Sequence, residues 1–285
     1  MKQLLILSGK GGTGKTTVAS AFVRLSEAKA YADCDVDAPN LHLIMEHDEP
    51  KISDYYGMKK ASIDKDKCIQ CDLCRMNCRF GAISKDNAYK VNNYDCEGCG
   101  VCEVICPASA VAMNDFKAGD LMLYTGKDTV FSTAELKMGS GNSGMLVTEV
   151  KKQMRLNSKA ELAIIDGSPG IGCPVIASIS GVNMVLIVAE PSVSGISDMR
   201  RIIETAASFK TKLAVCVNKY DTNREISDKI KMYCNKDNIN FIGEIPFDHN
   251  AVKAINNGYT IVDIDCAAGR AVRNIYNKSI DILYD

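Results

Sequence analysis

The sequence has no excess of charge of either sign. Its 285 residues include 34 lysines and arginines against 35 aspartates and glutamates, which leaves a formal net charge of −1. Such a balance gives no global attraction to nucleic acid or to an anionic membrane surface. No block of consecutive lysines and arginines forms a local basic patch that could attract them instead. We therefore expect no nucleic-acid partner and no membrane partner.

Long apolar runs are also missing. The longest run after the N-terminus, Met184–Ala189, is far shorter than the roughly 20 residues that span a bilayer. The run Leu4–Leu7 is too short for a signal peptide and leads into a glycine-rich loop, so we expect a buried strand there. These absences predict a cytoplasmic, reducing location, in which cysteines hold metal rather than form disulfides.

Cysteine, in contrast, is abundant, and eight of the 13 cysteines form two copies of one pattern. The pattern C-x2-C-x2-C-x3-C is typical of 4Fe-4S ligands, and two such clusters need eight thiolates. In two-cluster ferredoxins the fourth cysteine of each run ligates the other cluster, and zinc is the alternative metal. The first run is Cys68, Cys71, Cys74 and Cys78, and the second, offset by 28 residues, is Cys96, Cys99, Cys102 and Cys106. One cluster is thus predicted to be held by Cys68, Cys71, Cys74 and Cys106. The other is predicted to be held by Cys96, Cys99, Cys102 and Cys78.

A phosphate-binding loop precedes the cysteines and lies between a predicted strand and a predicted helix. Its glycines let backbone amides face phosphate oxygens, Lys15 can reach the β and γ phosphates, and Thr16 can bind Mg²⁺. The predicted nucleotide-binding residues of the loop are Gly9, Gly11, Gly12, Thr13, Gly14, Lys15, Thr16 and Thr17.

Short, continuous aliphatic runs predict a parallel sheet that is covered on both faces. These runs are Leu4–Leu7, Leu162–Ile165, Val185–Val188 and Leu213–Val217, and the helical stretches between them are Thr16–Ala28, Gly144–Met154, Ser197–Phe209 and Arg224–Tyr233. We therefore expect an α/β, doubly wound and mostly parallel domain. Residues 59–115 break this rhythm and have little aliphatic content. They predict an α+β, ferredoxin-like insertion between residues 1–58 and 116–285 of the discontinuous ATPase domain.

The loop Gly9-Lys10-Gly11-Gly12-Thr13-Gly14-Lys15 resembles the deviant P-loop of the MinD/ParA/Mrp and nitrogenase iron-protein group. The resemblance implies that Lys10 reaches across a dimer interface to the partner's nucleotide, in a homodimer or a paralogous heterodimer. A cation delivered in this way neutralises transition-state charge only when two protomers close. A solvent-exposed lysine is the alternative interpretation.

Two acidic segments continue the resemblance. The segment Asp33-Cys34-Asp35-Val36-Asp37-Ala38-Pro39-Asn40 is similar to the family's first switch. There Asp37 would orient or deprotonate the attacking water and Asp33 would lie near Mg²⁺, although helix capping also suits such residues. In Leu162-Ala163-Ile164-Ile165-Asp166-Gly167-Ser168-Pro169-Gly170, the resemblance makes Asp166 the Walker B carboxylate for Mg²⁺ and Gly170 an amide donor to the γ-phosphate.

Two later segments resemble nucleobase readers. Asn218-Lys219-Tyr220-Asp221 looks like an N-K-x-D motif, in which the aspartate selects guanine in G proteins. The family resembled here mostly uses ATP, with the asparagine reading adenine, and Pro246-Phe247-Asp248 is similar to its second base-side segment. We therefore expect Asn218, Lys219, Asp221, Pro246 and Asp248 to contact the base of ATP, with GTP as the alternative.

Cys173 lies seven residues after Asp166. The nitrogenase iron protein carries a cysteine that ligates a bridging cluster at a similar spacing. A packed thiol is the favoured interpretation here, because no second thiolate for a shared cluster is evident.

Taken together, these motifs predict an ATPase with two 4Fe-4S clusters, Mg²⁺ and ATP. Nucleotide-driven dimer closure would position the clusters for low-potential electron transfer to an acceptor protein. One alternative is an assembly factor that transfers a cluster or metallocofactor to an apo-metalloprotein. A second alternative is a MinD- or ParA-like spatial organiser with redox-sensing clusters.

Overall fold

The structure is a computed structural model that describes residues 1–45 and 48–285. The chain divides into two compact units. The first contains residues 1–52, 121–135 and 143–285, and the second contains residues 53–120 and 136–142. The ends predicted for the inserted domain, residues 59 and 115, lie inside the second unit.

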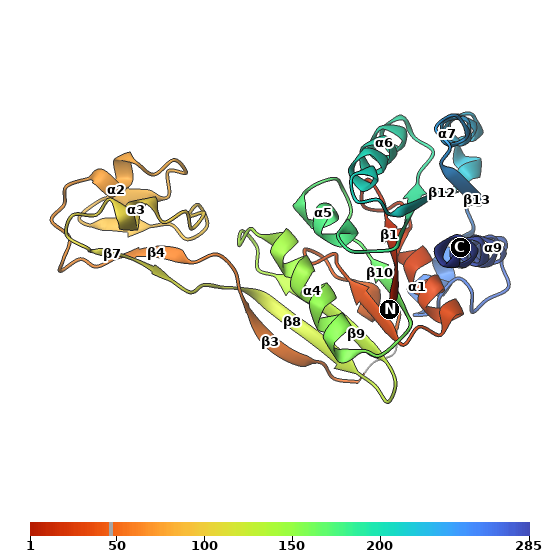
Figure 1. Cartoon of the computed structure of the whole chain (residues 1–285), viewed down its shortest axis with the longest axis horizontal. Coiled ribbons are helices and arrows are strands. Elements are labelled where there is room, and N and C mark those ends of the chain that lie inside the picture. Colours follow the sequence, from red (N-terminus) through yellow and green to blue (C-terminus); the bar gives the residue numbers. More distant parts are fainter. Residues whose placement is uncertain (46–47) are drawn as a thin grey trace. The chain divides into compact units, whose positions relative to one another are not determined.

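Most of a nine-stranded sheet with the order β13-β12-β11-β1-β10-β2-β9-β8-β3 lies in the first unit (Figure 1). Its strands are β1 (Lys2–Leu7), β2 (Ala30–Asp33), β3 (Lys51–Tyr56), β8 (Lys117–Thr125), β9 (Val130–Leu136), β10 (Leu162–Asp166), β11 (Met184–Ala189), β12 (Lys212–Asn218) and β13 (Asn240–Ile245). Every pairing from β13 through β9 is parallel. The carboxyl ends of these strands therefore meet at one edge of the sheet.

The aliphatic runs noted in the sequence form β1, β10, β11 and β12. All six side chains of β11 are buried, as expected for a central strand with both faces covered. The predicted α/β fold with a mostly parallel central sheet is confirmed.

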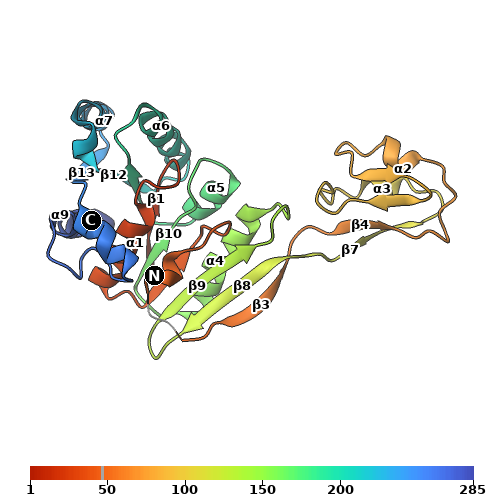
Figure 2. The same ribbon diagram turned by 180° about the vertical axis from the view of Figure 1, so that it is seen from behind.

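Helices cover both faces of this sheet. They are α1 (Lys15–Ser26), α4 (Ser143–Asn157), α5 (Cys173–Ile179), α6 (Val193–Ala207), α7 (Arg224–Lys236), α8 (His249–Asn256) and α9 (Ala267–Tyr284), with the 3-10 helices η1 (Leu41–Leu43) and η2 (Tyr220–Thr222). Helices α1 and α9 lie side by side (Figure 1 and Figure 2), where Phe22 and Tyr276 meet edge to face with ring centroids 5.2 Å apart. No helix in the described part of the chain is long and apolar enough to cross a membrane.

The second unit contains two short antiparallel pairs and two short helices. Strand β4 (Lys60–Ile63) pairs with β7 (Val111–Asn114), and β5 (Ile83–Lys85) pairs with β6 (Tyr89–Val91). The helices α2 (Leu73–Met76) and α3 (Val101–Val104) lie within the two cysteine runs. The buried cluster of this unit is small and consists of Ala61, Cys74, Ala82, Ile83, Tyr89, Cys96 and Val111. Cysteines thus make up part of its core.

Candidate functional site

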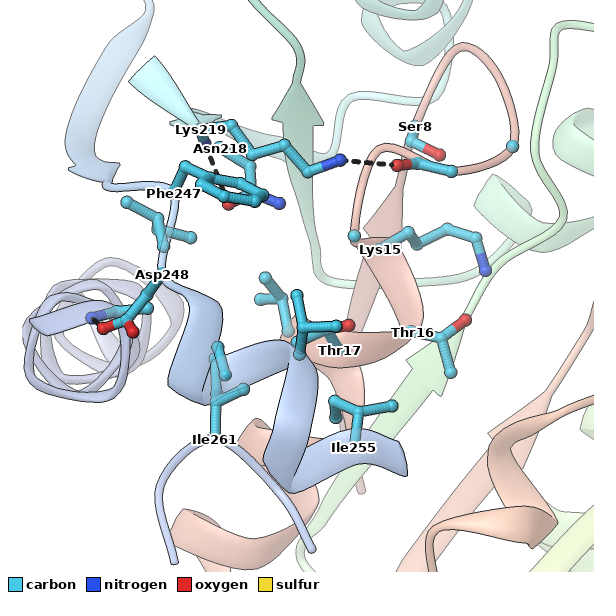
Figure 3. A pocket seen from close by; sticks show the side chains of 18 of the residues that line it. Ser8, Lys15, Thr16, Thr17, Asn218, Lys219, Phe247, Asp248, Ile255 and Ile261 are labelled. Atoms are coloured by element: carbon cyan, nitrogen blue, oxygen red, sulfur yellow. Dashed lines mark hydrogen bonds between the residues drawn. The ribbon is translucent and has the colours of Figure 1, made fainter. Parts of the chain in front are cut away.

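The loop between β1 and α1 borders a cavity of about 400 Å³ in the first unit (Figure 3). Gly12 and Gly14 have φ angles of 79° and 90°, in the left-handed region that glycine adopts without a steric penalty. Gly14 immediately precedes α1, so the positive end of the helix lies at the cavity. The residues of this loop and of the first turn of α1 that line the cavity are Ser8, Lys10, Gly11, Gly12, Gly14, Lys15, Thr16, Thr17 and Val18.

Asp166 joins the loop to the sheet. It is fully buried at the end of β10, next to β1, and burial raises its pKa to about 6. Its carboxylate accepts hydrogen bonds of 2.6 Å from both Lys15 Nζ and Thr16 Oγ1. The fold therefore brings together an ammonium, a hydroxyl and a carboxylate, the groups that bind phosphate and Mg²⁺ in P-loop proteins.

The acidic segment after β2 also brings to the cavity two residues that we did not single out from the sequence, Asp35 and Asn40. Asp33 is fully buried, and its carboxylate accepts hydrogen bonds of 3.0 Å from the backbone N–H groups of Asp35, Asn40 and Leu41. Asp33 therefore fixes the conformation of the loop. Asp37 is exposed and is not among the described residues that line the cavity, whereas Asp35 and Asn40 line it. The one signal in the sequence that could have pointed to Asp35 and Asn40 was their position in the same acidic segment as Asp37.

Gly170 is hydrogen-bonded to the residue before the phosphate loop, and Lys10 belongs to the loop itself. The Gly170 N–H donates to Ser8 O at 3.1 Å, and its φ of 96° again suits glycine. Lys10 Nζ lies 2.6 Å from Oε2 of Glu190, the residue that immediately follows β11. The two side chains are 41% and 26% exposed. Ion pairs this exposed contribute less than about 1 kcal/mol, so Glu190 restrains Lys10 only weakly.

Asn218, the last residue of β12, and Lys219, the residue after it, also hold the phosphate loop. Asn218 Nδ2 donates to Thr13 O at 2.6 Å. Lys219 Nζ donates to Gly12 O at 3.1 Å (Figure 3). Both residues also line the cavity. The loop that follows one strand thus supports the loop that follows another.

The far end of the cavity has an apolar wall. Pro246, Phe247 and Asp248 line it, together with the apolar residues Ile245, Ala251, Val252, Ile255, Ile261 and Ala268. Such a wall suits the flat face of a heteroaromatic base. Asp221 is not among the described residues that line the cavity.

Two small pockets in the second unit each collect four cysteines. Cys68, Cys71, Cys74 and Cys106 line one pocket, and Cys78, Cys96, Cys99 and Cys102 line the other. The fourth cysteine of each run therefore lies with the first three of the other run. Within the residues described, no group of three or more His, Cys, Asp or Glu side chains is placed to hold a single metal ion.

The backbones of the two cysteine runs follow the same course. Residues with a positive φ recur at the 28-residue offset of the cysteines, as the pairs Gln70 and Gly98, Asp72 and Gly100, and Gly81 and Ser109. Hydrogen bonds recur as well: Cys68 N donates to Asp64 O, and Cys96 N donates to Asn92 O. The sequence repeat is thus a structural repeat.

Cys173 is exposed, so the packed thiol that we favoured from the sequence is wrong. The physical reason is its position as the first residue of α5, at the surface end of the helix. Cys34, Cys216, Cys234 and Cys266 are buried.

The model of the CobQ/CobB/MinD/ParA nucleotide-binding domain matches residues 4–261. The chain belongs to this family. An uncharacterized protein of Methanocaldococcus jannaschii is 32% identical over 280 residues, which cover 97% of this chain and 95% of the relative. A much shorter match, 46% identical over 55 residues, covers 19% of this chain and 64% of pyruvate synthase subunit PorD of Methanothermobacter marburgensis.

Solved structures of MinD proteins share the fold of the family. The cell division ATPase MinD of Pyrococcus furiosus has a TM-score of 0.59 at 17% identity, covering 99% of both chains. MinD of Pyrococcus horikoshii in complex with Mg-ADP has a TM-score of 0.56 at 17% identity, covering 98% of this chain and 95% of that one. The family assignment identifies the protein as a nucleotide-binding P-loop protein, and these likenesses show that it has the fold of the MinD proteins.

We predict that Gly14→Ala weakens nucleotide binding by at least about tenfold, a loss of roughly 1.4 kcal/mol. A Cβ at Gly14 would lie 2.2 Å from Asn218 Nδ2, and the φ of 90° disfavours alanine. Titration calorimetry with ATP and Mg²⁺ measures the effect. The matched control is Gly172→Ala, whose Cβ would meet Pro174 Cδ at 3.7 Å, an ordinary contact. Equal affinities for the two variants would contradict the assigned role of the loop.

Proposed function

We propose that the protein hydrolyses ATP and couples nucleotide-driven dimer closure to low-potential electron transfer from two 4Fe-4S clusters to a partner protein. The observation that carries this proposal is the presence, in one chain, of a P-loop cavity and two pockets of four cysteines each. Neither feature by itself favours a redox ATPase over a simple ATPase or a simple ferredoxin.

ATP hydrolysis is supported by the family and by the groups at the phosphate end. Lys15 would bind the β and γ phosphates, while Thr16 and Asp166 would hold Mg²⁺, which neutralises charge on the transferred phosphoryl group. Asp37 would orient the attacking water, as the resemblance implies. Asp35, which lines the cavity, is a second candidate for that role.

The cysteine pockets fit 4Fe-4S clusters by number and by chemistry. A cubane cluster takes four thiolates and supplies one-electron redox chemistry. Each thiolate binds a different iron, so the four sulfurs need not converge on a single ion. The Ala110 N–H donates to Cys106 Sγ at 3.3 Å, and although burial raises the pKa of Cys106, such backbone N–H groups lower it overall. Amide donors of this kind stabilise a ligating thiolate.

Partners enter the proposal in two places. A second protomer, identical or paralogous, would receive Lys10 at its nucleotide, and an acceptor protein would take the electrons. The short match to a pyruvate synthase subunit and a 35% identical match over 92 residues to archaeal-type glutamate synthase (NADPH) favour a redox setting. Ligation by four cysteines per cluster suits retention of the clusters better than their transfer.

We expect Lys10→Ala to keep ATP affinity but to lower the hydrolysis rate by at least about 100-fold, because cations supplied in trans contribute roughly 10³–10⁵ in related transfers. Phosphate release and ATP-dependent dimerisation in the ultracentrifuge are the measurements. The matched control is Lys29→Ala, which also removes an exposed lysine that forms an ion pair, in this case with Asp128. Normal hydrolysis by Lys10→Ala would rule out the proposed role of this lysine.

Serine variants test the exchange of fourth cysteines. After anaerobic reconstitution, Cys106→Ser and Cys78→Ser should each lose roughly four of eight irons, because each breaks one cluster. Adding Cys71→Ser to Cys106→Ser should cost no further iron, whereas combining Cys106→Ser with Cys78→Ser should remove both clusters. Iron analysis and EPR provide the readouts. Bound zinc without an EPR signal would contradict the assignment of iron–sulfur clusters. Further loss of iron when Cys71→Ser is added to Cys106→Ser would contradict the assigned exchange of the fourth cysteines.

The proposed coupling is tested by titrating the reduction potential of the reconstituted protein with and without ATP. We expect the potential to shift on ATP addition while iron stays bound, and we expect no shift in Lys15→Ala, which lacks the phosphate ligand. Iron that moves to an apo-acceptor during hydrolysis would favour the cluster carrier instead. If ATP changes neither the potential nor iron binding, both functions are wrong.

A further inference from the structure

We propose that Lys60 raises the reduction potential of one of the two clusters, so that the clusters differ although their cysteine runs share one backbone conformation. The proposal deepens the function proposed above and rests on it for the presence of the clusters. The affected cluster is that of the second pocket, lined by Cys78, Cys96, Cys99 and Cys102. The other cluster is that of the first pocket, lined by Cys68, Cys71, Cys74 and Cys106.

Lys60 places a buried ammonium group in the second unit. It is the first residue of β4 and is 6% exposed. Its Nζ donates a hydrogen bond to the backbone carbonyl of Cys96 and lies 5.7 Å from the centroid of the Phe116 ring. Within the part of the chain that the structure describes, Lys60 forms no ion pair with a carboxylate. A buried charge without a counter-ion is costly, so a negative group is expected beside it.

A cluster in the second pocket would be that negative group. Cys96 lines this pocket, and its Sγ is only a few covalent bonds from the carbonyl oxygen that accepts from Lys60. Ala61, the next residue of β4, lines the same pocket. A cubane cluster with four thiolate ligands is negatively charged and becomes more negative on reduction. The Lys60 ammonium therefore stabilises the reduced form more than the oxidised form, which raises the reduction potential.

The segment that leads into β4 packs closely on the second cysteine run. A Cβ at Gly98 would lie 2.4 Å from Lys59 O and 3.0 Å from Met58 Cβ, so a larger residue does not fit. At the equivalent position of the first run, Gln70 has the same left-handed backbone but carries a side chain. This close packing fixes where the Lys60 ammonium lies relative to the second run.

The structural repeat shows what the first pocket has instead of this lysine. The offset of 28 residues between the cysteine runs makes Tyr89 equivalent to Ala61 and Ala88 equivalent to Lys60. Tyr89 lines the first pocket just as Ala61 lines the second, so the equivalence holds at the pockets. Ala88 carries no charge. An ammonium beside one pocket therefore corresponds to a methyl group beside the other.

Other charges near the pockets are more accessible to water. An acidic residue lines each pocket, Asp72 the first and Glu97 the second. Asp72 forms an ion pair with an arginine of α2, and Glu97 is exposed. Lys85 Nζ lies 5.2 Å from the centroid of the Tyr89 ring, but Lys85 is exposed too. Water and salt screen exposed charges, so we expect the buried charge of Lys60 to dominate the difference between the clusters.

The consequence is a preferred place for an electron. When the protein holds one electron, one cluster is reduced and the other is oxidised, and the electron can exchange between them. Lys60 favours the state in which the cluster of the second pocket is the reduced one. The two clusters would then carry electrons in a fixed order, because an electron collects at the cluster with the higher potential.

Substitutions in the full chain separate the charge of Lys60 from its packing. Lys60→Met removes the charge and keeps an unbranched side chain, while Lys60→Arg keeps the charge. Ala88→Lys adds a cation at the equivalent position beside the first pocket. The matched control is Lys59→Met, which removes an exposed lysine at the adjacent position.

After anaerobic reconstitution, iron analysis checks that each variant holds both clusters. A redox titration followed by EPR then gives the reduction potential of each cluster. Cys106→Ser and Cys78→Ser assign the two potentials, because each should leave one cluster intact.

We expect the parent protein to show two potentials, with the higher one at the cluster of the second pocket. Lys60→Met should lower that potential by at least about 59 mV, which is a tenfold change in the ratio of reduced to oxidised cluster for one electron. The other potential should stay in place. Ala88→Lys should raise the lower potential, and Lys60→Arg and Lys59→Met should resemble the parent.

An unchanged higher potential in Lys60→Met would overturn the proposal, and so would an equal shift of both potentials, which indicates a general structural effect. A higher potential at the first pocket in the parent would overturn the predicted order. If Lys60→Met does not assemble its clusters, Ala88→Lys still decides, because unchanged potentials there would show that a cation at this position does not act on a cluster.

Failure of the parent protein to bind iron is a different result. It would refute the proposed clusters and, with them, the role of Lys60. Clusters that form normally but whose potentials respond to neither Lys60→Met nor Ala88→Lys would refute the role of Lys60 alone.

Discussion

The buried carboxylate of Asp166 is the interaction on which the nucleotide site depends. A carboxylate with no exposed surface at the end of a central strand is costly unless charged or polar partners satisfy it. Lys15 and Thr16 provide these partners from the first turn of α1, and Ile6 of β1 pairs in register with Asp166 itself. The compensation of one buried charge thereby fixes the phosphate loop against the sheet, in the position where a phosphate and Mg²⁺ would bind.

The remaining parts of the site follow from the parallel arrangement of the strands. Loops after β1, β2, β10, β12 and β13 all emerge at one edge, so residues far apart in sequence can support one another. Asn218 and Lys219 hold the carbonyls of the phosphate loop, and Asp221 accepts a hydrogen bond from Phe247 N, after β13. Many of the polar side chains at this edge therefore form hydrogen bonds that hold the loops in place. The wall proposed to face the base is mostly apolar.

The second unit depends on a different kind of constraint. Its buried cluster consists of seven residues, two of them cysteines, which is little apolar surface for an independent core. In the proposed function, eight thiolate bonds to iron would supply much of the folding free energy, as metal ligation does in other small domains. The repeated positive φ angles place both runs in the same conformation, which is the requirement for two equivalent clusters.

The sequence alone determined the fold class, because continuous aliphatic runs and the glycine loop are local patterns with few structural solutions. It also singled out Lys15, Thr16 and Asp166, which the structure brings into hydrogen-bond contact. Only the tertiary structure decided which acidic residues face the cavity, since Asp33, Asp35 and Asp37 look alike in sequence and differ in burial. Asp221 and Asp248 likewise accept hydrogen bonds from backbone N–H groups of distant loops, and the exposure of Cys173 is set by where α5 begins. Such contacts depend on how strands are ordered in space, which no local pattern encodes.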